Sequence, residues 1–351
     1  MYLESFYRMK KRTFEILFSL LFGLALLAAL WQTASRNRTP VTESSGFHPV
    51  MGTLAQVTVV APDQRIAQIC IKTAFETMAQ INQSMNDRDP KSELSELSRT
   101  AFGKEAPVSP DLFAVLCASQ EYSRLSGGAF DITVGPEVAL WRQMEKTGIR
   151  PTPEQLEDAR AKVGYEKLIL NLHSQTVQLA KEGMKLDLGG IAKGFAVDLA
   201  IEAIRQKGAL GGMVDIGGNI RCFGRPPAPA KDWIIGLQNP QAETVLKRIK
   251  LNDFSIATSG DYRRYAESEG KKYSHILNPA TGDSANELIS VTILAPTAME
   301  ADALSTAVSV MGKQRGLALI DSLDEAEALL ITADRPDELI QTSRAADFLI
   351  D

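Results

Sequence analysis

A glycine-rich segment near the middle of the chain could bind a phosphate group. It reads DLGGIAKGFAVD (residues 187–198), a pattern that predicts a strand end, a glycine turn and a helix start. Glycines let the backbone approach a ligand, and a helix N-terminus offers free N–H groups and a positive dipole to an anion. The spacing G-G-x-x-x-G is not a dinucleotide fingerprint, and Phe195 stands where a P-loop needs lysine. A tight strand-to-helix turn without a ligand is an equally good interpretation.

A second segment has the side chains to bind a hard cation. Residues 298–311 are predicted to form a helix, and Asp302 and Thr306, four residues apart, then project from one face. The small alanines around them leave room for a bulky group. One carboxylate and one hydroxyl oxygen suit a Mg²⁺ ion that takes its other ligands from phosphate. For either residue alone, a polar stripe that faces water would be the better interpretation.

A third segment, GGAFDITVGP (residues 127–136), places an aromatic ring beside a carboxylate. Phe130 could stack on a flat ring, although a position in the core is favoured for a single phenylalanine. Asp131 is flanked by apolar residues, and a buried carboxylate needs partners. Asp131 is therefore the better functional candidate of the two.

A fourth segment, YSHILNPATG (residues 273–282), contains one of the three histidines of the chain. Its second half is a turn by composition. His275, just before this turn, could be a general base or a phosphate partner. A purely structural histidine is the alternative, and it is slightly favoured.

The remaining sequence must supply the elements that position these groups. Apolar alternation predicts strands, whereas apolar residues at helical spacing, with Ser or Thr before Pro at the start, predict helices. The predicted strands are 50–60, 167–172, 176–179, 185–188, 212–216, 233–237 and 290–295. The predicted helices are 63–85, 109–125, a short one from 152, 194–207, 298–311 and 314–323. Because strands and helices do not alternate strictly, an α+β fold is favoured over a doubly wound sheet.

The composition is that of an ordinary globular protein. Of the 351 residues, 44% are hydrophobic and 23% are charged, which excludes disordered, collagenous and multi-span membrane classes. The net charge of −5 is diffuse, which argues against a nucleic-acid partner. Three cysteines and three histidines are too few for a disulfide scaffold, a zinc site or a histidine-rich metal centre.

The N-terminal region has the features of an export signal. Basic residues at 10–12 precede the uncharged run 16–31, and polar residues follow it. This arrangement is typical of a signal peptide or a short membrane anchor, and the positive charges predict that residues 10–12 stay in the cytoplasm. The domain after it is then expected on the periplasmic side of the inner membrane, either anchored by residues 14–31 or released after cleavage. The expected division is a signal or anchor (1–31), a linker (32–46) and one folded domain (47–351).

Six segments in order along the chain match the motifs of one family. GAFDITVGP (128–136) matches G-A-F-D-x-T-V-G-P, and residues 187–198 match D-L-G-G-I-A-K-G-[YF]-A-V-D. APTAMEADALST (295–306) matches A-P-x-A-x-x-A-D-A-L-[SA]-T. The other three are MGT (51–53), MNDRDPKSELS (85–95) and VDIGGN (214–219). From about Phe47 to Phe348 the chain therefore resembles the ApbE-type FAD:protein FMN transferases, and six motifs are far more specific than one.

The resemblance implies an α+β, T-fold-like domain of mixed sheets and packed helices with a defined activity. Enzymes of this kind use FAD and Mg²⁺ to attach FMN covalently to a Thr or Ser hydroxyl, and they release AMP. The acceptors carry a D-x-x-[ST]-G-A-[ST]-like segment in membrane respiratory flavoproteins.

The resemblance also assigns roles to individual residues of this chain. Asp302, Thr306 and the backbone carbonyl of Ala192 would hold Mg²⁺. Lys193 and the amides near Gly190 would bind phosphate, and His275 would take or position the proton of the acceptor hydroxyl. The other implied FAD contacts are Met51, Asn86, Ala129, Phe130, Asp131 and Ile276, with His275 also in contact.

One position departs from the family pattern. The family commonly has H-I-[IL]-D-P-x-T-G, and this chain has Asn278 at the aspartate position. An amide keeps the turn and some hydrogen bonding, but it lacks the charge of a carboxylate. Turnover would be slower if that carboxylate assists the histidine.

Three other functions would use some of the same features. An exported FAD pyrophosphatase would keep the metal and FAD sites and use water as the acceptor. An exported flavin carrier would bind FAD without chemistry. A nicotinamide or flavin oxidoreductase is the third alternative, and the absent dinucleotide fingerprint weighs against it.

Overall fold

The computed structural model of the chain describes Gly23 and residues 39–260, 265–268, 271–274 and 276–350. Apart from Gly23, the predicted signal or anchor lies outside the described residues, and so does His275. In the part of the chain that is described, no helix combines the length and the apolar character needed to span a bilayer.

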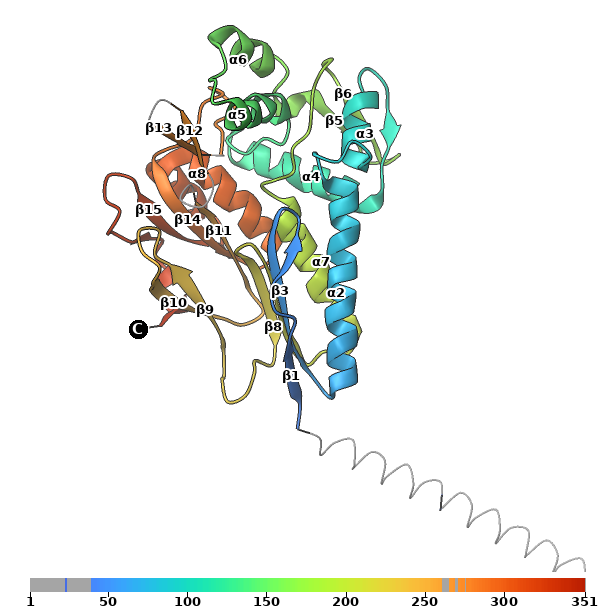
Figure 1. Ribbon diagram of the computed structural model, residues 1–351, viewed down its shortest axis with the longest axis vertical. Coiled ribbons are helices and arrows are strands. Elements are labelled where there is room, and N and C mark those ends of the chain that lie inside the picture. The colour runs from blue at the N-terminus through green and yellow to red at the C-terminus, as the bar shows by residue number, and fades with distance from the viewer. Residues whose placement is uncertain (1–22, 24–38, 261–264, 269–270, 275, 351) are drawn as a thin grey trace, which may run out of the picture.

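A nine-stranded sheet forms the centre of the fold (Figure 1). The strand order is β1-β3-β7-β8-β11-β14-β15-β16, with β2 paired to β3. Every ladder between these strands is antiparallel, which agrees with the predicted α+β class. The bounds are Val41–Ser44 (β1), His48–Val50 (β2), Thr53–Ala61 (β3), Gly211–Ile216 (β7), Asn219–Gly224 (β8), Ser255–Gly260 (β11), Leu288–Ala295 (β14), Glu327–Thr332 (β15) and Ile340–Gln341 (β16).

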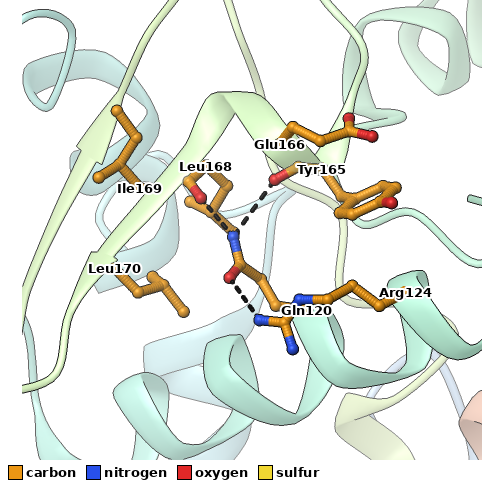
Figure 2. Close-up of a pocket in the computed structure, with 7 residues that line it drawn as sticks. All are labelled: Gln120, Arg124, Tyr165, Glu166, Leu168, Ile169 and Leu170. Carbon is orange, nitrogen blue, oxygen red and sulfur yellow. Dashed lines mark hydrogen bonds between the residues drawn. The ribbon is translucent and has the colours of Figure 1, made fainter.

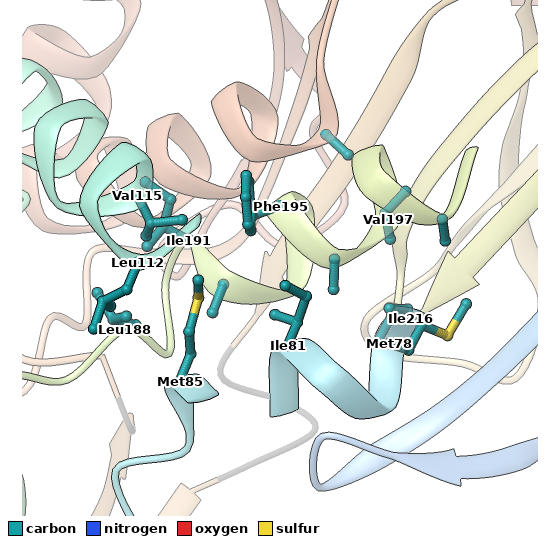
Figure 3. Packing of buried hydrophobic residues seen from close by; sticks show 14 of the residues in the cluster. Met78, Ile81, Met85, Leu112, Val115, Leu188, Ile191, Phe195, Val197 and Ile216 are labelled. Atoms are coloured by element: carbon teal, nitrogen blue, oxygen red, sulfur yellow. The ribbon is translucent and has the colours of Figure 1, made fainter. Parts of the chain in front are cut away.

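Three helices pack against the sheet and against one another: α2 (Gln64–Met85), α7 (Ala192–Gln206) and α8 (Ala298–Asp321). The predicted helix at 63–85 is confirmed, with the Asp63 side chain accepting from the Ile66 amide at 3.0 Å as the N-cap. Figure 3 shows the buried cluster beneath these helices, which includes Met85, Leu188 and Ile191. The end of α2 and the turn before α7 thus share one core.

A second apolar cluster lies between the main sheet and a three-stranded sheet of β9 (Trp233–Gln238), β10 (Val245–Leu251) and β17 (Leu349–Ile350). Successive side chains of a strand point to opposite faces, and β14 shows this directly. Ile293 packs in the cluster with α8, whereas its neighbour Leu294 packs in the cluster with β9 and β10. The main sheet is therefore covered on both faces.

A smaller lobe is inserted between α2 and α7 (Figure 1). Its three short strands run in the order β4-β6-β5. Its elements are α3 (Glu93–Thr100), β4 (Ala106–Pro107), α4 (Pro110–Leu125), α5 (Gly135–Thr147), α6 (Pro153–Arg160), η1 (Tyr165–Lys167), β5 (Leu168–Asn171) and β6 (Thr176–Leu179). The remaining elements of the chain are β12 (Tyr265–Ser268), β13 (Lys271–Ser274) and η2 (Ala345–Phe348).

One sequence prediction about strands is confirmed except at its start, and another is wrong. The strand predicted over 50–60 is formed as β3 from Thr53 onward, but a two-residue turn precedes it, because Met51 and Gly52 have φ angles of 48° and 72°. Positive φ at both central residues is typical of a tight hairpin turn, here between β2 and β3. The strand predicted over 185–188 is not formed. That segment makes a single bridge, between Lys185 and Val134, and belongs to no sheet.

The two helices predicted at the end of the chain form one element with a break. Gly312, at φ 77° and ψ 179°, interrupts α8 between the predicted segments 298–311 and 314–323. The Glu287 carboxylate accepts from the Lys313 amide at 2.8 Å and caps the second part. A Cβ at Gly312 would meet the carboxylate end of the Glu287 side chain. The positive φ of Gly312 is the reason that the break favours glycine.

Candidate active site

The first turn of α7 lies against α8 and brings opposite charges together. The Lys193 ammonium lies 3.2 Å from Oδ2 of Asp302 and donates to the Gly189 carbonyl at 2.6 Å. The Gly194 amide donates to the same Asp302 oxygen at 3.0 Å. Asp302 is only 3% exposed, and a buried charge needs partners. The Lys193 ammonium and the Gly194 amide are these partners. The predicted phosphate segment and the predicted cation segment therefore meet at one place.

Thr306 and the glycine turn complete this group. A Cβ built on Gly190 would lie 2.8 Å from the Thr306 Oγ1, so the backbone of the turn runs directly beside that hydroxyl. Thr306 also donates to the carbonyl of Asp302 at 3.2 Å. Ala192 is the first residue of α7 and is buried. The structure thus gathers Gly190, Ala192, Lys193, Asp302 and Thr306, which were predicted from two segments about 100 residues apart.

The donor set of this group fits a hard cation such as Mg²⁺. A buried carboxylate and a hydroxyl lie one helical turn apart, and the ammonium of Lys193 shows that the carboxylate faces a position suited to positive charge. Among the described residues no cluster of three His, Cys, Asp or Glu side chains could enclose a metal ion. A site with one carboxylate leaves ligand positions for phosphate oxygens, as expected for Mg²⁺ bound with a nucleotide.

Two contacts fix α7 against α8. Asp198 accepts from the amides of Ala298 and Met299, each at 2.9 Å, and thereby caps the N-terminus of α8. Asp198 also forms an ion pair with Arg221 at 2.8 Å. Burial raises the pKa of the Asp198 carboxyl group. A Cβ on Gly194 would lie 2.1 Å from the Ala298 carbonyl oxygen, so the two helices touch backbone to backbone.

Gly194→Ala is expected to lower the free energy of unfolding by about 1–3 kcal/mol, because the added methyl group meets backbone that cannot rotate away. Urea unfolding followed by circular dichroism measures the loss. Gly236→Ala is the matched control, since the Cβ there meets only the exposed side chain of Val245, at 3.1 Å. Equal stability of the two variants would contradict the close helix contact.

Asp131 is buried and makes its hydrogen bonds within the protein. Its Oδ1 accepts from the amide of Thr133 at 2.8 Å and from the Thr133 hydroxyl at 2.6 Å. The Thr133 hydroxyl in turn accepts from the Gly164 amide at 2.8 Å. Burial raises the pKa of Asp131, while the hydrogen bonds from Thr133 and from the backbone of Tyr165 oppose that rise. In this structure the carboxylate fastens the 131–133 segment to the loop at Gly164.

Ala129 and Phe130 lie in the interior of the same segment. Phe130 is 2% exposed and contacts the ring of Tyr122 edge-on, with the ring centroids 6.3 Å apart. Ala129 is also buried. The structure therefore places Phe130 in the core, which is the position that the sequence favoured.

Backbone contacts join the segment 128–136 to the start of the glycine-rich segment 187–198. The amide of Asp187 donates to the Ile132 carbonyl at 2.8 Å. Gly135 permits the approach, because a Cβ there would lie 2.5 Å from the Lys185 carbonyl oxygen. Segments 128–136 and 187–198 thus run side by side, although more than 50 residues separate them in the sequence.

The other predicted FAD contacts lie at three further places. Asn86 is the C-cap of α2, and its side chain accepts from the Arg88 amide at 3.0 Å. Met51 lies in the turn between β2 and β3 and packs against the main core cluster. Ile276 is buried, and its carbonyl accepts from the Ala285 amide at 2.9 Å. His275, the predicted base, lies outside the described residues.

The predicted turn after His275 is present and packs against α5. The Asn278 carbonyl accepts from the amides of Thr281 and Gly282. The Trp141 indole donates to the Gly282 carbonyl at 2.8 Å. Glu137, on the same helix, is fully buried beside this turn, and within the described residues its carboxylate oxygens have no hydrogen-bond partner. Its closest opposite charge is Arg160, at 3.9 Å.

Glu137 makes stability depend on pH. Burial raises its pKa from 4.5 to about 8, despite the opposing effect of Arg160, so the folded chain keeps a proton that the unfolded chain has lost. Stability should therefore fall as the pH rises from about 4.5 to about 8, by up to about 1.4 kcal/mol per pH unit. Glu137→Gln should remove this decline in urea unfolding at different pH values. Glu145→Gln, exposed on the same helix, should keep it; a Glu137→Gln profile identical to wild type would contradict the assignment.

The sequence analysis did not identify one polar residue of this region, Arg142. Arg142 of α5 forms ion pairs with Asp87 and with Asp187, the latter at 2.8 Å. The helix Gly135–Thr147 was not predicted, so Arg142 was not placed near either carboxylate. The available signal was that both aspartates stand inside recognised motifs and would require a cation if they were buried.

An open hollow lies elsewhere, between α4 and the edge strand β5 (Figure 2). The Gln120 amide bridges this edge by donating to the carbonyls of Tyr165 and Leu168. Arg124 donates to the Gln120 carbonyl oxygen at 3.3 Å. None of the predicted site residues lines this hollow, so the candidate site is the polar group between α7 and α8.

An α+β domain with an ammonium, a helix N-terminus and a buried carboxylate gathered at one point is a protein suited to binding a metal-associated phosphate group. The profile of the ApbE family matches residues 51–330. The chain therefore belongs to the ApbE family.

Relatives and solved structures agree with this membership. The FAD:protein FMN transferase of Haemophilus influenzae is 36% identical over 326 residues, covering 89% of this chain and 92% of the relative. That of Vibrio cholerae is 32% identical over 319 residues, with coverages of 89% and 94%. The ApbE protein of Thermotoga maritima has a TM-score of 0.80 at 29% identity, and the flavin transferase ApbE of Vibrio cholerae has 0.79 at 29%. Each of these two covers 89% of this chain and 100% of its own.

Proposed function

We propose that this chain is a FAD:protein FMN transferase, which uses Mg²⁺ and transfers FMN from FAD to a Thr or Ser hydroxyl of an acceptor protein. The relatives of that name match this chain over most of both lengths. The structural observation that supports the activity is the group formed by Lys193, Asp302 and Thr306 at the start of α7. It offers positive charge and a metal-ligand set to a diphosphate at one place.

The residues of the chain bind and orient the FAD diphosphate. Lys193 and the amides near Gly190, just before α7, stabilise negative charge on the phosphate oxygens. Asp302, Thr306 and the carbonyl of Ala192 would hold Mg²⁺. When bound, the ion polarises the phosphate oxygens and neutralises the charge that develops on the leaving group. The segments around Met51, Asn86 and Ile276 form the walls of the flavin and adenine pockets.

The reaction breaks the phosphoanhydride bond between the two halves of FAD and forms a phosphoester bond to the acceptor hydroxyl. The acceptor hydroxyl oxygen attacks the phosphorus of the FMN half of FAD, the bond from this phosphorus to the bridging oxygen breaks, and AMP leaves. The proton of the hydroxyl passes to a base, and His275 is the candidate for that role. Asp131 holds the 128–136 segment in place through the hydrogen bonds that it accepts from Thr133.

The acceptor is a membrane respiratory flavoprotein subunit that carries a D-x-x-[ST]-G-A-[ST]-like segment. A direct test incubates the full chain with FAD, Mg²⁺ and an acceptor domain, and then examines the acceptor by in-gel flavin fluorescence. Fluorescence that disappears when the acceptor Thr or Ser is replaced supports transfer. Free FMN and AMP without a labelled acceptor would instead show a hydrolase, and unchanged bound FAD would show a carrier.

The proposed location is the periplasmic side of the inner membrane, with residues 1–31 as a cleaved signal or an anchor, 32–46 as a linker and 47–351 as the transferase domain. An alkaline phosphatase fusion after Pro40 should be active, because the basic residues at 10–12 keep the preceding end in the cytoplasm. An inactive fusion, together with an active cytoplasmic reporter fused at the same residue, would reverse this topology.

A further inference from the structure

Arg142 connects the loop that follows α2 with the turn that precedes α7. From α5, its guanidinium forms ion pairs with Asp87 through Nη1 and with Asp187 through Nη2, the latter at 2.8 Å. Asp187 also accepts from the Gly189 amide at 2.8 Å. The Arg142 side chain is 29% exposed and that of Asp187 is 11% exposed, so these charges are largely withdrawn from water.

Each of the two aspartates stands near a residue to which the proposed function gives a role in FAD binding. Asp87 follows Asn86 directly at the end of α2, and Asp187 begins the turn that contains Gly189 and Gly190. Met85 and Leu188, the neighbours of these loops, are buried in one cluster (Figure 3). Apolar packing thus brings the loops together, and the guanidinium is the cation between their carboxylates.

Charge explains why a guanidinium is needed at this position. Burial and the Asp87 carboxylate raise the pKa of Asp187, whereas Arg142 and the more distant Arg88 lower it. Glu145, on the exposed side of α5, adds negative charge near Arg142. Without Arg142, two carboxylates would face each other beside a bound diphosphate. A lysine could not replace it fully, because only the planar guanidinium presents two donors in fixed directions.

We propose that Arg142 is a positioning residue for FAD: it holds the loop at Asn86 and Asp87 and the Gly189–Gly190 turn in register, and it offsets part of the negative charge of the two carboxylates that would repel the diphosphate. This inference rests on the proposed function, since it assumes that FAD is the ligand of this site. It adds a residue of α5 to the binding apparatus, and that residue acts through Asp87 and Asp187 without touching FAD.

The test measures the dissociation constant of FAD for the full chain, by flavin fluorescence, at about pH 5.5 and about pH 8, where a pair of facing carboxylates differs in protonation. The variants are Arg142→Met, Arg142→Lys and the double change Arg142→Met with Asp87→Asn. Lys146→Met, exposed one turn further along α5, removes the same charge and is the control. Thermal unfolding of every variant verifies that it is folded.

Arg142→Met should weaken FAD binding at least ~10-fold near pH 8, which corresponds to about 1.4 kcal/mol. The loss should be smaller near pH 5.5, because one carboxylate then takes up a proton. Adding Asp87→Asn should restore most of the affinity and remove the pH dependence, and Arg142→Lys should lie between Arg142→Met and wild type.

Two results would overturn the inference while wild-type FAD binding remains intact. Arg142→Met could bind FAD like Lys146→Met at both pH values, or it could lose affinity equally at both without rescue by Asp87→Asn. Failure of the wild-type chain to bind FAD is a different result. It would overturn the proposed function and this inference together.

Discussion

Asp302→Ala is expected to abolish FMN transfer while the chain stays folded. Asp302 supplies the buried carboxylate that faces Lys193 and the first turn of α7. Its removal takes away a metal ligand and the negative charge that draws a cation beside the diphosphate. We expect a loss of at least ~10³-fold, the upper end for removal of one preorganised electrostatic group. Alanine favours a helix, so α8 should persist.

The measurement is transfer of FMN to an acceptor domain over a range of Mg²⁺ concentrations, combined with the binding isotherm of Mn²⁺ as a spectroscopic substitute. Asp321→Ala, at the exposed end of the same helix, is the control and should behave like wild type. Near-wild-type transfer by Asp302→Ala, with an unchanged dependence on Mg²⁺, would place the metal elsewhere.

His275→Ala is expected to reduce transfer at least ~100-fold, because general-base assistance is typically worth 10²–10⁴-fold. The hydroxyl of Thr or Ser keeps its proton at neutral pH, so its attack on phosphorus needs a base or a strongly orienting group. Histidine titrates near pH 6.5 when unperturbed and suits this role. His173→Ala, at an exposed turn, is the matched control and should leave transfer unchanged.

A substitution at Asn278 tests the role of His275 as the base in a second way. A carboxylate at this position raises the pKa of a neighbouring histidine, so the basic form of the ring appears at higher pH. Asn278→Asp should therefore leave transfer unchanged or increase it, and its pH optimum should be no lower than that of wild type. Wild-type transfer by His275→Ala would show that the base lies elsewhere.

The elements with a strong periodic pattern could be predicted from the sequence, and those that depend on distant partners could not. The helix at α2 has apolar residues at regular spacing and a capping Asp63, so it was predicted within one residue. The helix at α5 was missed because its first turn reads as part of the glycine-rich motif 127–136, and its buried face includes the charged Glu137. The extended segment 185–188 pairs with a loop near Ile132, a partner that no local pattern reveals.

The candidate site shows the same division. Asp302 and Thr306 could be placed together because a helix fixes residues four apart on one face. That Lys193 meets Asp302 depends on the backbone contact between Gly194 and Ala298, which is a property of the packed helices. Arg142 could not be assigned because its two partners come from loops 100 residues apart in the chain. Phe130 fitted both a ring-stacking and a core interpretation, and only the packing against Tyr122 separates them.

The most direct test of the central claim counts products in one reaction mixture of the full chain, FAD, Mg²⁺ and an acceptor domain. AMP is quantified by chromatography, and the acceptor that carries covalent FMN is quantified by intact mass. A transferase must release one AMP for each acceptor modified, and replacing the acceptor Thr or Ser must suppress both products together. AMP released at the same rate without a modified acceptor would contradict the account and identify a hydrolase.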